Sequence, residues 1–121
     1  MKVTRLSQGA LTNLLEGKTS VPATCVVKFY SNGCHYCHKL KEYYETIAEE
    51  HSDLHFFAFN IQDAAGIEKQ LGFKGVPTII KVNTTSGMPQ VEVIDEPHTP
   101  NEHTYYTSAE IKNFINGENQ K

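Results

Sequence analysis

The stretch TCVVKFYSNGCHYC, residues 24–37, joins an apolar run to a pair of cysteines and decides the fold. Its first half, Thr24–Tyr30, is β-branched, aromatic and almost continuously apolar, which predicts a strand covered on both faces of a sheet. Ser31-Asn32-Gly33 then breaks the strand, and apolar residues recur at helical spacing from Cys34 to Glu50. The sequence therefore predicts a central strand followed by a helix that begins at a Cys-x-x-Cys motif.

Further elements on either side of this stretch follow from hydrophobic spacing and capping residues. They are a helix around Leu6–Leu15 with Ser7 as its cap and Gly17 at its end, a strand at Leu54–Asn60, a short helix at Ala64–Leu71 capped by Asp63 and ended by Gly72, two hairpin strands at Pro77–Val82 and Val91–Ile94 joined by a polar connection that contains Ser86-Gly87, and a last helix with a capping box from Thr107 to Glu110 and an end at Gly117. This order predicts one α/β domain over residues 1–121. We expect a three-layer α/β/α sandwich with a central mixed β-sheet.

Composition and charge limit the classes of partner. The 121 residues suffice for one core, and 11 basic against 14 acidic side chains give a net charge of −3. No run of Lys or Arg exceeds a pair, so we expect no nucleic-acid partner. The apolar stretches are shorter than a bilayer span, and residues 1–7 lack the apolar region of a secretory signal. We accordingly expect a cytoplasmic monomer with no membrane partner.

Cys34 and Cys37 are the candidate catalytic residues. Two intervening residues at a strand-to-helix junction place both sulfurs in the first helical turn, close enough for a reversible disulfide. Unpaired N–H groups and the positive end of the helix dipole favour a thiolate at Cys34, which predicts that Cys34 is the nucleophile and Cys37 the resolving cysteine. His35 either adds positive charge when protonated or is a solvated side chain. Cys25 is interpreted as a buried core thiol. This chemistry needs no cofactor and no metal.

A second signal lies further along, where Gly75-Val76-Pro77-Thr78 precedes a predicted strand. Together with the Cys-x-x-Cys motif, this segment resembles the thioredoxin family. The resemblance implies a cis Val76–Pro77 peptide bond beside the disulfide, and a backbone at Val76, Pro77 and Thr78 that pairs with the substrate. It also implies dithiol–disulfide exchange with protein disulfides, with a reductase or a small thiol as electron donor. We favour a protein disulfide reductase; a disulfide oxidase or isomerase is the alternative.

Two positions depart from the family pattern. Thioredoxins and protein disulfide isomerases usually place a buried acid six residues before the first cysteine, where this chain has Lys28. Lys28 could transfer a proton or tune a thiolate, but we expect its stem to extend to solvent instead. Gly33 replaces the aromatic residue common in thioredoxins, so the loop from Gly33 to Cys37 resembles that of glutaredoxins, in which Tyr36 would contact a thiol ligand. Because no Gly-Gly-Asp-like segment follows the last strand, glutaredoxin is the lesser resemblance.

The chain also carries a polar insertion, residues 95–106 (DEPHTPNEHTYY), where thioredoxins have a short glycine-containing turn. In the family that turn lies beside the active site. We hypothesise that His98, His103, Tyr105 or Tyr106 borders a substrate groove and narrows the choice of partner. A solvated, proline-containing loop is the alternative.

Three rival functions use the same motif. The Cys-x-x-Cys pair and His38 match the attachment pattern of c-type haem, but the predicted strands and the absence of an export signal disfavour it. A non-catalytic thioredoxin-fold module is disfavoured by the intact cysteine pair. Zinc would need two further ligands at a spacing that is not typical of zinc sites; the candidates are His35, His38, His98 and His103.

Overall fold

The computed structural model describes residues 3–19, 22–85, 88–97, 100, 102 and 104–117 of the chain. These residues form five strands, four α-helices and a short 3₁₀ helix, η1. In chain order the elements are β1 (Val3–Arg5), α1 (Gln8–Leu15), β2 (Thr24–Tyr30), α2 (His35–Glu50), β3 (His55–Asn60), η1 (Ile61–Asp63), α3 (Ile67–Leu71), β4 (Thr78–Asn83), β5 (Gln90–Val93) and α4 (Ser108–Asn116).

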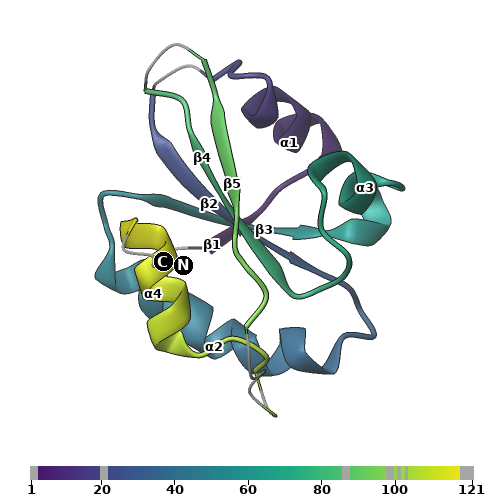
Figure 1. Cartoon of the computed structure of the whole chain (residues 1–121). Helices are drawn as coiled ribbons and strands as arrows, with labels where there is room; N and C mark the ends of the chain where they lie inside the picture. The colour runs from purple at the N-terminus through teal and green to yellow at the C-terminus, as the bar shows by residue number, and fades with distance from the viewer. Residues whose placement is uncertain are drawn as a thin grey trace.

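The five strands form a mixed sheet in the order β1-β3-β2-β4-β5. β3 pairs in parallel with β1 and β2, whereas β4 pairs antiparallel with β2 and β5. Helices α1 and α3 cover one face of the sheet, and α2 and α4 cover the other (Figure 1). The expected three-layer α/β/α sandwich with a central mixed sheet is confirmed.

The central strand β2 is buried on both faces, as its continuous apolar character predicts. Cys25, Val27 and Phe29 belong to the apolar cluster under α1 and α3, while Val26 belongs to the cluster under α2 and α4. Because side chains alternate along a strand, Lys28 points to the same face as Val26. A lysine therefore stands in an otherwise apolar layer beneath α2.

Two elements differ from the sequence-based expectation. The strand β1 is not predicted, because three residues at a sheet edge carry little periodic signal. The helix α3 begins at Ile67, after Gly66 with a left-handed φ of 85°. Asp63 is not its cap; the Asp63 carboxylate instead accepts a 2.9 Å hydrogen bond from the Arg5 guanidinium. Residues 64–66 of the predicted helix form a bend and a turn instead, and the separate η1 lies before them.

Other predicted boundaries agree with the structure. Ser7 caps α1 as expected. The capping box of α4 is complete: the Glu110 N–H donates to Thr107 Oγ1 at 3.1 Å, and the Thr107 N–H donates to the Glu110 carboxylate at 2.8 Å. β4 and β5 form the expected antiparallel hairpin, whose Ser86-Gly87 lies outside the described residues.

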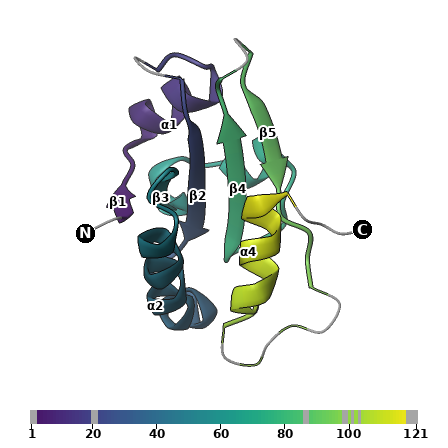
Figure 2. The same ribbon diagram turned by 90° about the vertical axis from the view of Figure 1, so that its left-hand side faces the viewer.

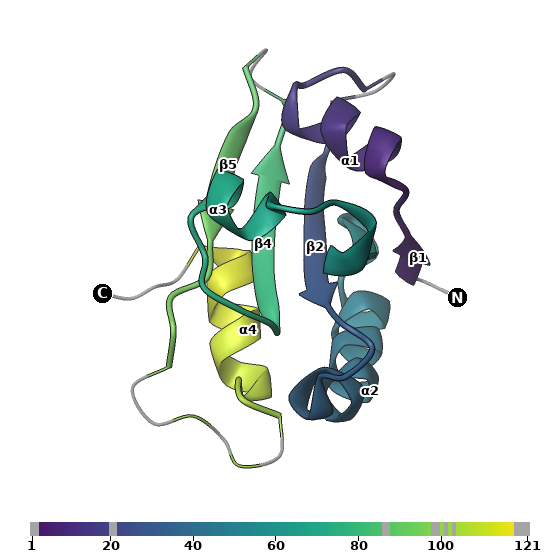
Figure 3. The same ribbon diagram turned by 90° about the vertical axis from the view of Figure 1, so that its right-hand side faces the viewer.

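The topology brings distant chain segments to one end of the sheet. β2 ends and β4 begins there, because the two strands are antiparallel and Phe29 pairs with Thr78 (Figure 3). α2 begins at the same end, and α4 packs beside α2 on the same face of the sheet (Figure 2). The strand-to-helix junction thus lies next to the proline segment that precedes β4. Among the described residues, no helix combines the length and the apolar character needed to cross a membrane.

Candidate active site

Cys34 and Cys37 form a disulfide at the start of α2, with their Cα atoms 5.2 Å apart. Cys34 is the N-cap of this 16-residue helix, and the backbone N–H of Cys37 donates to Cys34 Sγ at 3.0 Å. This N–H and the positive end of the helix dipole would stabilise negative charge on that sulfur after reduction. Cys34 is 9% exposed and Cys37 is 3% exposed. The geometry therefore suits Cys34 to attack and Cys37 to resolve.

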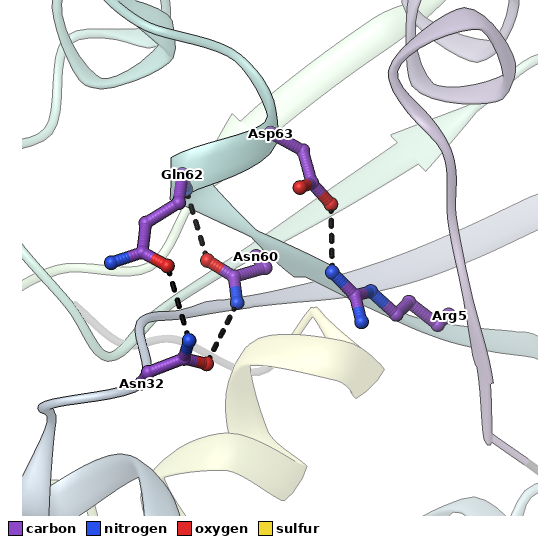
Figure 4. A network of polar contacts seen from close by, with 5 residues as sticks. All are labelled: Arg5, Asn32, Asn60, Gln62 and Asp63. Atoms are coloured by element: carbon purple, nitrogen blue, oxygen red, sulfur yellow. Dashed lines mark hydrogen bonds and ion pairs between the residues drawn. The ribbon is translucent and has the colours of Figure 1, made fainter.

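A polar network holds the loop before Cys34 against the end of β3 (Figure 4). The buried Asn60 amide donates to Asn32 Oδ1 at 3.0 Å, and Asn60 Oδ1 accepts the Gln62 backbone N–H at 2.9 Å. Asn32 in turn donates to the Gln62 side chain at 3.2 Å. From the other side, His38 Nε2 donates to the Asn32 carbonyl at 3.1 Å. The loop is thus tied to both β3 and α2, which fixes the position of the first cysteine.

Sequence reasoning missed this network. Asn32 is expected only to break the strand, and its partners lie too far away in sequence to be inferred from local pattern. The usable signal is Asn60, a polar residue at the end of the apolar strand β3. A buried amide needs hydrogen-bond partners, so Asn60 predicts a polar contact without identifying it.

A cavity of about 300 Å³ lies between the sheet and α2, and both Lys28 and Cys37 line it. Lys28 is only 5% exposed, and its Nζ lies 5.1 Å from the centre of the Tyr44 ring. The expectation that Lys28 extends to solvent is wrong, because the central strand and α2 enclose its stem. We call this space the Lys28 cavity; its other charged or ionisable lining residues include Arg5, His38, Lys41 and Glu45.

The charge on Lys28 has little compensation. Burial lowers the pKa of Lys28 to about 8, although the Glu45 carboxylate opposes this shift and Lys41 adds to it. In the described part of the chain, no carboxylate oxygen lies within 4.0 Å of Lys28 Nζ. Its neighbours are the rings of Tyr44 and Tyr30, at 5.1 and 5.9 Å from Nζ to ring centre, which offer a weaker cation–π attraction.

A second hollow, of about 220 Å³, adjoins the first turn of α2. We call it the Tyr105 groove; its lining includes Tyr36, Val76, Pro77, Thr78, Tyr105 and Tyr106. The Val76–Pro77 bond is cis, as the family resemblance implies. Thr78 Oγ1 donates to the Gly75 carbonyl at 2.6 Å, which closes the turn before β4. The three residues expected to hold the substrate backbone therefore lie together with Tyr36.

The insertion contributes two tyrosines to this groove. Tyr106 is 1% exposed, and the ring of Tyr105 lies 5.0 Å from that of Tyr106 and 5.6 Å from that of Tyr36, measured between ring centres. Burial raises the pKa of both inserted tyrosines, so their hydroxyls stay protonated at neutral pH. Tyr105 and Tyr106 thus line the Tyr105 groove, whereas His98 and His103 lie outside the described residues.

The remaining candidate residues occupy simpler surroundings. His35 is exposed, and its ring centre lies 5.9 Å from that of Tyr36. Gly33 is exposed, with open space where a side chain would stand. Cys25 is buried, and burial raises the pKa of its thiol. Within the described residues, no three His, Cys, Asp or Glu side chains gather to hold a metal ion, so the zinc alternative gains no ligand set there.

Comparisons with known proteins agree with this geometry. A family model described as Thioredoxin matches residues 16–116. By structure, the chain is similar to thioredoxin f from spinach chloroplast, with 20% identity, a TM-score of 0.70, and coverage of 97% of this chain and 93% of that one. It is also similar to chloroplastic thioredoxin z, with 19% identity, a TM-score of 0.68, and coverage of 98% and 95%.

A third similar structure is the J-Trx1 fragment of ERdj5, with 19% identity and a TM-score of 0.69. That match covers 96% of this chain but 49% of the fragment, so the chain spans about half of it. By sequence, the chain matches none of the curated proteins with which it was compared. At these identities the structural likenesses establish the fold alone.

Proposed function

The chain belongs to the thioredoxin family, and on that premise we propose that it is a protein disulfide reductase acting through Cys34 and Cys37. The observation that carries the proposal is their disulfide at the start of α2, with the Cys37 N–H directed at Cys34 Sγ. A Cys-x-x-Cys pair at disulfide distance in a thioredoxin fold supports thiol–disulfide oxidoreductase chemistry. The reductive direction and the protein substrates are the proposed part.

The reaction proceeds in two exchanges that move two electrons. The Cys34 thiolate attacks one sulfur of the substrate disulfide, which forms a mixed disulfide and releases the other substrate sulfur as a thiolate. Cys37 then gives up its proton and attacks Cys34 Sγ, which closes the Cys34–Cys37 disulfide and releases the second substrate thiolate. Both substrate thiolates take up protons. The substrate is reduced, the cysteine pair is oxidised, and a reductase or a small thiol regenerates the dithiol.

Val76, Pro77 and Thr78 are proposed to position the substrate chain. Pairing of β4 with β2 begins at Thr78, so the Val76 backbone lies outside the sheet ladder while it lines the Tyr105 groove. An extended substrate segment laid against it would add main-chain hydrogen bonds at this position. Tyr36 stands between the two cysteines and lines the same groove, so the segment would lie beside the disulfide.

Lys28 is proposed to tune Cys37. Both residues line the Lys28 cavity, and a pKa of about 8 keeps most of the lysine charged at neutral pH with a fraction as the free amine. The ammonium would stabilise a Cys37 thiolate, and the amine could accept the thiol proton. Because the ammonium favours the reduced pair, Lys28→Met should make the reduction potential more negative. An unchanged potential would remove Lys28 from the mechanism.

We place this reaction in a reducing cytoplasm, because a disulfide reductase needs a compartment whose thiols keep its own cysteines reduced. The chemistry needs no cofactor. A monomer suffices, since both cysteines belong to one chain. Its partners are disulfide-bonded proteins and an electron donor, with no role assigned to nucleic acid or membrane.

The test is the reduction potential of the Cys34–Cys37 pair, measured by equilibrating the protein in glutathione buffers and trapping free thiols. We expect a value near about −270 mV, the thioredoxin range. If no disulfide forms in any buffer, the whole proposal fails.

A disulfide oxidase or isomerase is the second candidate, and the buried Lys28 favours it. A cation close to the cysteine pair stabilises thiolates and so makes the disulfide a stronger oxidant. A potential at or above about −180 mV would replace the reductase by this candidate.

A further inference from the structure

The backbone of Tyr105 is held in an uncommon conformation. Its φ is 68°, in the left-handed region that favours glycine, and among the described non-glycine residues only Tyr105 has a positive φ. The neighbouring residues hold this turn: the Tyr106 N–H donates to the Thr104 carbonyl at 2.7 Å, and Thr104 Oγ1 donates to the Tyr106 carbonyl at 2.7 Å. Such conformations persist where surrounding contacts impose them, and they concentrate at binding sites.

The consequence of this turn is an aromatic wall beside the cysteine pair. Tyr106 is buried beneath the groove, while Tyr105 is half-buried and its ring centre lies 5.6 Å from that of the exposed Tyr36. Tyr36 comes from α2 and Tyr105 from the insertion, so two segments distant in sequence form one aromatic surface. Val76 and Pro77 complete the apolar lining.

The size and charge of the Tyr105 groove indicate what it could bind. Its volume of about 220 Å³ is below the usual range for whole small-molecule ligands, which indicates room for one large side chain. Lys74 and Glu96 both line it, so their opposite charges leave no net sign to select a charged group. Ring faces and aliphatic carbon remain as the recognition surface, and they favour an apolar or aromatic side chain.

We propose that Tyr36 and Tyr105 bind one bulky apolar side chain of the protein substrate, adjacent to the cysteine whose disulfide is reduced. This inference rests on the proposed function and specifies its substrate class. The groove adjoins the Val76–Thr78 backbone, so a substrate held there in extended form presents its cysteine to the disulfide and a neighbouring side chain to the two rings. Tyr105 is then a specificity-determining residue that takes no part in the sulfur chemistry.

The experiment uses two synthetic peptides, each closed by one disulfide and differing only in the residue beside a cysteine, which is Phe in one and Ser in the other. The readout is the ratio of kcat/KM for the two peptides, because a ratio cancels any general change in disulfide chemistry. We expect the wild type to prefer the Phe peptide roughly tenfold, the scale of one apolar pocket contact. Tyr105→Asn should reduce the ratio to below about twofold, since Asn tolerates a positive φ but lacks the ring.

Matched variants separate the ring from other effects. Tyr105→Phe keeps the ring and should keep the preference. Tyr43→Asn removes a 46% exposed tyrosine elsewhere on α2 and should leave the ratio unchanged. If Tyr105→Asn does not fold, Tyr105→Gly takes its place, because glycine accepts the same φ.

The outcomes distinguish failure of the inference from failure of the proposed function. A wild-type ratio near one, or a full preference retained without the Tyr105 ring, overturns the inference and leaves the reductase proposal standing. If the wild type reduces neither peptide under reducing conditions, the proposed function itself fails.

Discussion

The Lys28 cavity and the Tyr105 groove adjoin the same first turn of α2, and they are built in opposite ways. Tyr36 and Cys37 are neighbours in sequence, yet Tyr36 lines the groove and Cys37 lines the cavity. The groove presents neutral rings, two of them partly exposed, and its charged lining residues Lys74 and Glu96 have opposite signs. The cavity instead encloses the Lys28 cation, with no carboxylate oxygen within 4.0 Å of its Nζ in the described part of the chain. Substitutions in the cavity and in the groove should therefore change different properties of the protein.

The difference indicates that the Lys28 cavity affects the stability of the protein, whereas the Tyr105 groove affects its specificity for substrates. A buried ammonium costs stability because the low-dielectric interior disfavours charge. Aromatic rings at the surface cost little and are ready to cover a partner's apolar group. We expect substitutions in the cavity to change unfolding and the redox pair, and substitutions in the groove to change substrate choice. The following variants test that separation.

Removing Cys37 has the largest expected effect, because it removes the thiol that resolves the mixed disulfide at Cys34. Cys37→Ser should still form a mixed disulfide at Cys34 but fail to release it, so turnover should fall by on the order of 1,000-fold or more. Non-reducing electrophoresis and mass spectrometry of the adduct check this. Cys25→Ala is the control and should turn over normally. An equal yield of adduct from Cys34→Ser would contradict the assignment of the nucleophile.

Lys28→Met should stabilise the protein, which would show that the Lys28 cavity lowers stability. The pKa of Lys28 falls from 10.5 to about 8 on folding, so the unfolded chain binds more protons between these values and wild-type stability rises with pH across that window. At pH 7 the variant should gain about 3 kcal/mol in free energy of unfolding, and the gain should shrink as pH rises from 8 to 10.5. Denaturant titrations at several pH values measure it.

The exposed Lys41→Met is the matched control for Lys28→Met and should change stability little. A gain that is the same at pH 7 and at pH 10.5 would show that packing, rather than charge, accounts for the effect. No gain at pH 7 would show that Glu45 or the aromatic rings already compensate the ammonium.

Asn60→Ala should have a moderate effect on stability. It should loosen the loop before Cys34 without changing a lining residue of the Lys28 cavity or of the Tyr105 groove. It leaves Asn32 Oδ1 and the Gln62 N–H without their partner, which should cost about 1–2 kcal/mol of unfolding free energy. Hydrogen exchange should speed up at residues 31–33. Gln62→Ala removes an exposed partner and should cost less. If exchange in the loop does not change, the network does not hold the first cysteine.

Arg5→Ala should have the smallest effect. Arg5 lines the Lys28 cavity, but its ion pair with Asp63 joins side chains that are 59% and 39% exposed. Solvent screens such a pair, so the denaturation midpoint should stay at the wild-type value in both low and high salt. A clear loss of stability would show that the edge of the cavity is more rigid than its exposure indicates.

Much of the fold can be predicted from the sequence, because period and capping agree along most of the chain. The run Thr24–Tyr30 predicts β2 with its observed bounds, and the Thr107–Glu110 pattern predicts the capping box of α4. Local pattern fails where a distant partner decides the structure. Asp63 suits a helix cap by composition, but Arg5 pairs with it from β1.

The candidate site follows the same rule. The Cys-x-x-Cys spacing predicts the disulfide and its place at a helix start, since both depend on residues within one turn. The burial of Lys28 depends on which side chains cover the α2 face of the sheet. Sequence alone does not identify those side chains, so it does not distinguish a buried lysine from one that extends to solvent. The meeting of Tyr36 with Tyr105 depends on the course of the insertion, which periodicity does not reveal.

Cys25 gives the protein an internal reporter of unfolding. It is 6% exposed, burial raises the pKa of its thiol, and it lies on the face of β2 opposite to Lys28. An alkylating reagent added to the reduced native protein should therefore modify Cys34, the more exposed cysteine of the active-site pair, and spare Cys25. Modification of Cys25 then times the opening of the central strand, and mass spectrometry can follow that event without any added probe.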